Sequence, residues 1–308
     1  MSDITLLKNK LLLVASSGAF ANFSPEQVKE YNDELEHFLL VSTDSLDSIE
    51  LFNLYELEFY LALISKNDIK AKSVLDRLLD QFGSNKKSQR IKLLQSLFLE
   101  ATGERDQATK LLEKNPDEML LSRRLTTFSR NNDDEKDNED YIYNLIFYLD
   151  LQPSDLVTWA ELGDEYSKIG HYDKAIFSFK EILLQDPYAY PVFYKVALNY
   201  YYNFLQEEKN LKTERKDKLV ELSELLINAR DNALRCIEIC DVYAKSWLLI
   251  YIISTHKFNE KLSKLDSVKE IKDYLVTNER LRKLSEIKIS ELIPEDERAN
   301  VLAQLQLK

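Results

Sequence analysis

One segment of 34 residues, Leu156 to Ala189, constrains the possible folds of this chain more than any other feature of its sequence. Its large, small and turn-forming residues are spaced as in two helices joined by a short turn, and they are Trp159, Leu162, Gly163, Tyr166, Gly170, Ala175, Phe179 and Pro187. Trp159, Leu162 and Tyr166 lie on one face of a helix, because they are three and then four positions apart. Pro187 follows Pro153 by 34 residues, the interval that a repeating unit requires. The segment therefore predicts a helical hairpin that recurs along the chain.

The small residues of this hairpin have specific places. Gly163 has no side chain, so the second helix can approach the first closely there. Gly170 ends the first helix, where a left-handed backbone conformation is often needed. Ala175 and Phe179 form a small-then-large pair that faces back onto the first helix. The order and spacing match the tetratricopeptide (TPR) pattern at each of these positions, and the sequence therefore predicts a TPR unit.

A second tryptophan, Trp247, marks a later unit. It follows Trp159 by 88 residues, which is two periods of 34 with a surplus of 20, and the polar stretch 206–218 accounts for the surplus. With this insertion, the places of Ala175, Phe179, Ile182 and Pro187 are taken by Ala229, Ala233, Cys236 and Asp241. Weaker signals for a turn followed by a helix lie at 66–78 and 102–112. We count five to six units between Phe52 and Thr277.

We therefore predict an all-α fold, a TPR-type solenoid of helical hairpins wound as a right-handed superhelix with helical caps. Residues 1–50 are the expected N-terminal cap, 51–277 the array of five to six units, and 278–308 the C-terminal cap and tail. The array contains an acidic loop at 131–140 and an insertion at about 203–220. In the N-terminal cap, Ser24-Pro25-Glu26-Gln27 provides a start signal for a helix.

The composition supports this prediction and excludes several classes of protein. Only 5 Gly and 6 Pro occur among 308 residues, too few turn residues for an all-β fold. The net charge of −12 argues against direct binding to nucleic acid or anionic lipid. No apolar stretch approaches the roughly 20 residues of a membrane span, and the run 11–15 favours an amphipathic helix over a signal peptide. We expect a cytosolic or nuclear chain that meets a membrane only through partners.

No pattern of catalytic or metal-binding residues stands out. The three histidines lie far apart in the sequence, and Cys236 and Cys240 lack a second pair of ligands nearby. We therefore expect both cysteines to be packing residues. The five glycines form no phosphate-binding or nucleophile-elbow motif. The sequence predicts no enzyme activity, no cofactor and no metal.

Aromatic residues cluster between Tyr188 and Phe204. Phe193 and Tyr200 take the places of Trp159 and Tyr166, so they are expected in the core. Three other tyrosines of this cluster fall outside the expected core positions, and they are Tyr194, Tyr201 and Tyr202. They lie on a first helix of the repeat, where such positions tend to line the concave groove. Tyrosine is favoured at interfaces, so these three are candidate partner-binding residues. Additional packing within the chain is the alternative.

Three stretches carry a resemblance to a known family. They are the start, from Lys10-Leu11-Leu12-Leu13 to Asn22-Phe23-Ser24-Pro25-Glu26-Gln27, the unit Asp155 to Tyr190, and the stretch Asn232-Ala233-Leu234-Arg235 to Trp247. The chain resembles, over nearly its full length, the fungal family of subunit 2 of the endoplasmic reticulum (ER) membrane protein complex. Many unrelated scaffolds share the TPR pattern. The start motif and the insertion after Tyr202 narrow the resemblance to this family.

The resemblance implies a peripheral scaffold subunit on the cytosolic side of the ER membrane. Members of that family hold cytosolic segments of the membrane-embedded subunits, including a YidC-like insertase subunit. The complex inserts tail-anchored proteins and some helices of multispanning proteins. The implied role of this chain is binding to the other subunits, without nucleic acid and without bond chemistry.

Two other roles fit a TPR array. A soluble co-chaperone or adaptor would bind acidic chaperone C-termini through a clamp of cationic and amide side chains. The corresponding places in the best unit hold Ala160 and Asp164, and the carboxylate of Asp164 would repel such a ligand. A scaffold in a nuclear or RNA-processing assembly is the second alternative, and cell fractionation separates it from an ER role.

Overall fold

The structure is a computed structural model of the chain. It describes residues 3–43, 46–83, 88–112, 118–130, 135–211, 215–264 and 269–294, which form helices and turns and, within these ranges, no strand. The chain divides into two compact units, Met1–Asp137 and Asn138–Lys308. Each unit has its own cluster of buried apolar side chains. Among the described helices, none combines the length and the hydropathy that crossing a membrane requires.

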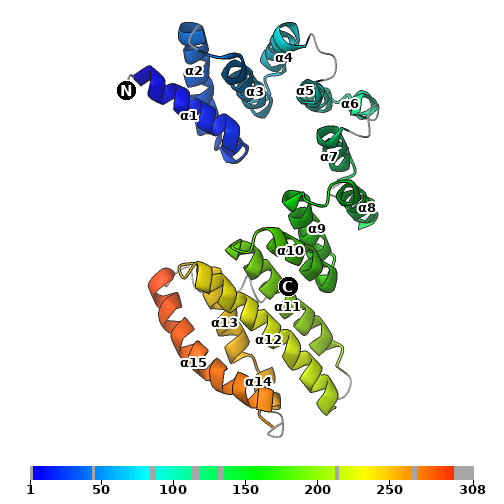
Figure 1. Cartoon of the computed structure of the whole chain (residues 1–308), viewed down its shortest axis with the longest axis vertical. Helices are drawn as coiled ribbons and strands as arrows, with labels where there is room; N and C mark the ends of the chain where they lie inside the picture. Colours follow the sequence, from blue (N-terminus) through cyan, green and yellow to red (C-terminus); the bar gives the residue numbers. More distant parts are fainter. Residues whose placement is uncertain are drawn as a thin grey trace. The chain divides into compact units, whose positions relative to one another are not determined.

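The first unit is a succession of helices in which neighbours along the chain pack against each other (Figure 1). Its elements are α1 (Asp3–Ser17), the 3-10 helix η1 (Ala19–Asn22), α2 (Pro25–Ser42), α3 (Ser48–Ile64), α4 (Asp68–Phe82), α5 (Gln89–Ala101), α6 (Arg105–Leu112) and α7 (Met119–Phe128). The pairs α3–α4 and α5–α6 are helical hairpins. The signals at 66–78 and 102–112 thus correspond to the turns and second helices of these pairs, as predicted. Lys66 and Gly103, with φ of 56° and 85°, form the turns.

The predicted start signal of α2 is confirmed in atomic detail. The backbone N–H of Gln27 donates to Ser24 Oγ over 3.3 Å, and the backbone N–H of Ser24 donates to Gln27 Oε1 over 2.9 Å. Pro25 occupies the first turn, where its missing N–H has no partner to lose. This reciprocal capping satisfies two of the free N–H groups at the helix start.

Replacing the capping serine should therefore destabilise the first unit. We expect Ser24→Ala to lower the free energy of unfolding by about 1 kcal/mol, because one N–H of α2 loses its acceptor. Ser73→Ala, at an exposed position inside α4, is the matched control and should leave the stability unchanged or slightly higher, since alanine is the better helix former. Chemical denaturation followed by circular dichroism measures both. Equal stability of the two variants would contradict the capping role.

In the second unit, too, helices that follow one another along the chain pack against each other (Figure 1). Its elements are α8 (Glu135–Leu151), α9 (Leu156–Lys168), α10 (Tyr172–Gln185), α11 (Tyr190–Lys209), α12 (Lys216–Ile239), α13 (Ala244–Thr255), α14 (Phe258–Leu262) and α15 (Lys269–Leu292). The helix α8 begins just before the boundary of the two units. The helices of each hairpin contact each other, in the pairs α9–α10, α11–α12 and α13–α15. The contacts α10–α11 and α12–α13 link one hairpin to the next.

The close approach predicted at Gly163 is present. A Cβ atom at this position would lie 2.7 Å from Phe179 Cε1, so only glycine lets α10 rest on α9 here. Gly170 has a φ of 78°, the left-handed conformation expected at the end of the first helix. Ala175 and Phe179 are fully buried against α9. These contacts confirm the TPR geometry of the α9–α10 hairpin.

The two tryptophans make the same contact in different units. The indole N–H of Trp159 donates to the carbonyl oxygen of Pro153 over 2.9 Å, and that of Trp247 donates to the carbonyl oxygen of Asp241 over 2.6 Å. Each accepting carbonyl lies six residues before its tryptophan, in the loop that leads into the helix. This shared hydrogen bond supports the prediction that Trp247 marks a later unit.

Two predicted irregular segments are mostly helical. Residues 135–140 of the expected acidic loop 131–140 belong to α8, and 131–134 lie outside the described residues. The insertion at about 203–220 lengthens two helices, because α11 and α12 have 20 and 24 residues where α9 and α10 have 13 and 14. Only 212–214 of this insertion lie outside the described residues. The structure thus differs from the predicted loop at 135–140, where a helix forms, because charged residues such as Glu and Lys are good helix formers.

Candidate functional site

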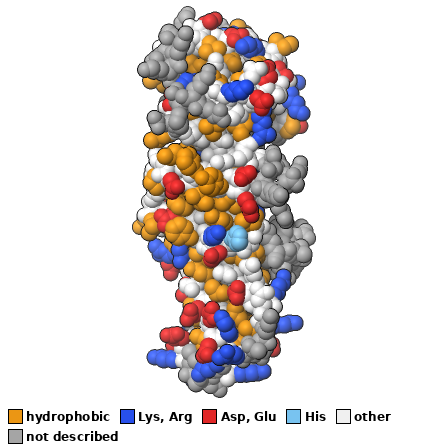
Figure 2. All heavy atoms as spheres, turned by 90° about the vertical axis from the view of Figure 1, so that its right-hand side faces the viewer, with side chains coloured by type: hydrophobic (Ala, Val, Ile, Leu, Met, Phe, Trp, Pro, Cys, Tyr) orange, Lys and Arg blue, Asp and Glu red, His pale blue; other side chains and the backbone are white. Residues whose placement is uncertain are grey.

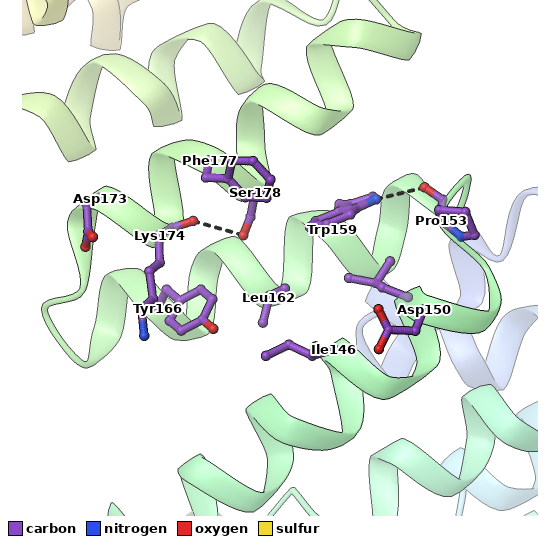
Figure 3. Close-up of a pocket in the computed structure, with 11 residues that line it drawn as sticks. Ile146, Asp150, Pro153, Trp159, Leu162, Tyr166, Asp173, Lys174, Phe177 and Ser178 are labelled. Carbon is purple, nitrogen blue, oxygen red and sulfur yellow. Dashed lines mark hydrogen bonds between the residues drawn. The ribbon is translucent and has the colours of Figure 1, made fainter.

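An apolar hollow of about 560 Å³ opens on the surface of the second unit. It is lined from α8 by Ile146, Leu149 and Asp150, from the following loop by Pro153, from α9 by Trp159, Leu162 and Tyr166, and from α10 by Asp173, Lys174, Phe177 and Ser178 (Figure 3). The first helix of the hairpin, α9, forms its floor, and α8 and α10 form its walls. No residue of α11, where we expected the partner groove, lines the hollow.

The floor of the hollow is built from signature residues of the repeat. Leu162 is buried, while Trp159 and Tyr166 are only half-buried, because α8 and α10 leave part of α9 uncovered. The Trp159 ring is held in place by its hydrogen bond to Pro153 and by an edge-to-face contact with Phe177, with the ring centroids 6.1 Å apart. Phe177 itself is 59% exposed. The hollow therefore presents aromatic surface that is already fixed in position.

Charged side chains stand at the two ends of the hollow. Figure 3 shows Asp173, Lys174 and Tyr166 at one end and Asp150 with Pro153 at the other. The Lys174 Nζ atom lies 5.3 Å from the centre of the Tyr166 ring, in cation–π geometry. Burial and then the nearby Asp173 carboxylate raise the pKa of Tyr166. Within the described ranges, the Asp150 and Asp173 carboxylates make no ion pair.

The surface around the hollow is also apolar. Figure 2 shows hydrophobic side chains gathered at mid-height on the face that it presents. On α8 the exposed apolar side chains are Tyr143, Ile146, Phe147 and Leu151. Large exposed patches of this kind commonly mark sites of protein binding.

The repeat pattern in the sequence marks the residues of the floor of this site but not those of its walls. Ile146, Asp150 and Phe177 were not among the predicted residues, although α8 carried a usable signal. One of its faces packs into the core through Tyr141, Ile142, Leu145 and Leu149. A second face of α8 also carries apolar residues, namely Tyr143, Ile146 and Phe147. A helix that packs against the core on one face only needs one apolar face, so this second face was the signal.

The three candidate partner-binding tyrosines lie in the core. Tyr194, Tyr201 and Tyr202 are 7%, 3% and 5% exposed, and burial raises the pKa of Tyr201 to about 12. The Tyr194 ring meets Tyr243 at 5.5 Å, and the Tyr202 ring meets Tyr172 at 5.6 Å.

The expected exposure of these tyrosines was wrong for a physical reason. Helix α11 contacts α10, α12 and α13, so helices cover the face that was predicted to line a groove. Phe193 and Tyr200, predicted as core residues, are only half-buried. Tyr194, Tyr201 and Tyr202 therefore pack within the chain, as the alternative interpretation held, and they offer a partner little surface. Partner binding by these residues stays an untested prediction.

The remaining structural positions follow the repeat. Trp247 is buried in α13, and Pro187 is exposed two residues after α10 ends. We expected Asp164 to repel acidic peptides. Both of its carboxylate oxygens accept hydrogen bonds from Lys195 Nζ, each over 2.7 Å. The cation that could bind a carboxylate here is thus already paired.

The chemistry of the hollow fits binding. Ser178 Oγ donates to the carbonyl oxygen of Lys174 over 3.0 Å, so its hydroxyl is engaged in the helix. In the described part of the chain, no group of three or more His, Cys, Asp and Glu residues is placed to hold a metal ion. Fixed aromatic rings with charges at both ends are the features of a site that buries apolar side chains of a partner.

Comparisons with known proteins agree with the fold and with the family resemblance. No family model matches the chain. It is 26% identical over 263 residues to ER membrane protein complex subunit 2 of Saccharomyces cerevisiae, covering 81% of this chain and 85% of that protein. It is 29% identical over 263 residues to the TPR repeat protein oca3 of Schizosaccharomyces pombe, covering 84% and 81% of the two chains. The resemblance predicted from the sequence is thereby confirmed.

A solved structure shows the same fold. The C-terminal part of a TPR repeat-containing protein from Cytophaga hutchinsonii matches 95% of this chain and 98% of its own, with a TM-score of 0.51 and 14% sequence identity. At this identity the likeness speaks for the fold alone. The prediction of an all-α TPR fold is confirmed.

Proposed function

We propose that this chain is a scaffold subunit of an ER membrane protein complex and that it works by binding polypeptide segments of the other subunits. The observation that carries the proposal is the similarity to the yeast subunit 2, which extends over 81% of this chain and 85% of that protein. A match of this extent reaches into both compact units, and so concerns more than one shared repeat.

The geometry of the second unit supports a binding role. Repeat arrays present extended surfaces, and their usual work is to hold other polypeptides. The hollow between α8 and α10 offers apolar surface with the Trp159 ring already fixed, which lowers the entropy cost of association. Burial of apolar surface there stabilises a complex by roughly 25 cal/mol per Å² before the costs of association.

The finer role that we propose concerns membrane insertion. The chain would lie on the cytosolic side of the ER membrane as a peripheral subunit. It would hold flexible cytosolic segments of the membrane-embedded subunits, including a YidC-like insertase subunit, near the entry route of tail-anchored and multispanning proteins. In this proposal the chain contributes position and performs no bond chemistry.

Affinity purification tests the assembly. The tagged chain is purified from detergent-solubilised membranes of its own organism, and the co-purifying chains are identified by mass spectrometry. We expect the membrane-embedded subunits of the ER complex in amounts comparable to the tagged chain. A tagged chain that purifies alone, or with nuclear RNA-processing proteins or cytosolic chaperones, would overturn the proposal.

Sidedness requires a separate experiment on sealed microsomes. We expect external protease to digest the chain while an ER luminal marker stays protected, and alkaline carbonate to release it from the membranes. Protection equal to that of the luminal marker would contradict the proposed location.

A further inference from the structure

We propose that the hollow binds an amphipathic partner helix whose apolar side chains are flanked by two basic residues about two helical turns apart. The inference rests on the proposed function, because it names the kind of segment that the scaffold holds. It follows from three properties of the hollow, namely its lining, its size and its charges.

The lining calls for apolar side chains. Trp159 and Phe177 expose ring surface to the hollow, and Ile146 completes the opposite wall from α8. The polar group of the tryptophan points to Pro153 and is already satisfied. A ligand that fills the hollow with polar groups would find few partners for them, and unpaired buried polar groups are costly.

The size favours side chains inserted from a helix that lies across the rim. A volume of about 560 Å³ accommodates a few large side chains. It does not accommodate a whole helix, whose diameter with side chains is roughly 10–12 Å. A helix lying along the hollow places residues three and four positions apart on one face, which is how such helices anchor in apolar grooves.

The charges set the flanking residues. Asp173 and Asp150 stand at opposite ends of the hollow, and neither makes an ion pair within the described ranges. Among the described residues, Lys174 is the one cation that lines the hollow, and its ammonium group lies over the Tyr166 ring. Two carboxylates therefore face the rim against one ammonium group, and the whole chain has a net charge of −12. This field attracts a basic segment and repels an acidic one.

The floor of the hollow determines the expected spacing of the two basic residues on the ligand helix. Trp159 and Tyr166 mark the two ends of the hollow on α9, seven residues apart. Seven residues of helix span about 10 Å. A ligand helix running along α9 thus brings basic residues at its positions 1 and 8 near Asp150 and Asp173, with apolar residues at positions 4 and 5 over the hollow.

Synthetic helical peptides and the full chain test this inference. The probe is a fluorescein-labelled peptide on an Ala/Gln background, with Lys at positions 1 and 8 and Leu at positions 4 and 5. One matched peptide carries Glu in place of both Lys residues, and another carries Ser in place of both Leu residues. Fluorescence polarisation should show saturable binding of the first peptide and roughly tenfold weaker binding of each of the others.

Charge reversal on the chain makes the test specific to the hollow. We expect the double variant Asp150→Lys, Asp173→Lys to lose roughly tenfold in affinity for the Lys peptide and to prefer the Glu peptide. The control is Asp80→Lys with Asp106→Lys, which changes the net charge equally near the end of α4 and in the first turn of α6, both exposed. The control should bind both peptides as the unaltered chain does. Equal behaviour of the two double variants would overturn the inference.

A third variant tests the apolar half of the site. Phe177→Ala removes an exposed ring, so the chain should keep its melting temperature while its affinity for the Lys peptide falls roughly tenfold. Unchanged affinity would count against the proposal. If the unaltered chain is a dimer that Phe177→Ala converts to a monomer, the hollow binds a second copy of this chain and the inference is also overturned.

The two proposals fail separately. Loss of peptide binding in a chain that still co-purifies with the ER complex rejects the inference and leaves the proposed function standing. Specific binding of the Lys peptide by a chain that does not join the ER complex supports the inference and rejects the proposed function.

Discussion

Gly163→Leu is expected to lower the free energy of unfolding by about 1–3 kcal/mol, because the second helix has no room for an added side chain. Even a Cβ atom would lie 2.7 Å from the Phe179 ring. That ring is fully buried, so it cannot swing into solvent. The helix α10 must shift instead, and the contact that builds the hairpin is lost. Chemical denaturation followed by circular dichroism measures the change.

A control and a double variant identify the cause. Val157→Leu adds bulk at an exposed position of the same helix and should change the stability by less than about 0.5 kcal/mol. Phe179→Ala alone should cost about 3–5 kcal/mol. In its presence, Gly163→Leu should cost less than it does alone, since the leucine can enter the vacated space. Additive effects would show that the two residues do not share a contact.

Tyr201→Ala is expected to destabilise the isolated chain by about 3–5 kcal/mol, the usual cost of removing a buried aromatic ring. The side chain is 3% exposed and lies among Tyr202, Phe204 and His256, with ring centroids 6.2–6.3 Å away. Its main effect should therefore be on folding. Differential scanning calorimetry of the purified chain measures it without any partner present.

The matched control is a tyrosine of the same cluster on the surface. Tyr188 is 71% exposed, so Tyr188→Ala should change the stability by no more than about 0.5 kcal/mol. If Tyr201→Ala instead left the melting temperature of the isolated chain unchanged and weakened only the assembly with partners, the partner-groove interpretation would be restored.

Patterns that depend on a single hairpin could be predicted from the sequence. Gly163, Gly170 and Phe179 take their places because two consecutive helices must pack, and a short stretch of sequence contains both helices. The capping box at Ser24 and Gln27 is more local still, since donor and acceptor are three residues apart. Both features were therefore predictable in type and in position.

Features that depend on a third helix could not be predicted in this way. Tyr194 and Tyr201 pack against Tyr243 and His256 at the two ends of α13, and Tyr202 packs against Tyr172 of α10. The spacing within α11 does not show how many helices cover it. The hollow likewise depends on the separation of α8 and α10, which is set by packing between neighbouring hairpins. Sequence spacing identified Trp159 and Tyr166 as signature residues, but it gave no sign that they would face an opening.

The indole hydrogen bonds of Trp159 and Trp247 have a mechanical consequence. Each hydrogen bond connects the loop before a first helix to that helix, and so helps to fix the angle at which one hairpin follows another. At the corresponding place in α11 stands Phe193, whose ring has no donor for such a bond. The joint between α10 and α11 therefore lacks this hydrogen bond, and the packing of the two helices against each other must hold their angle instead.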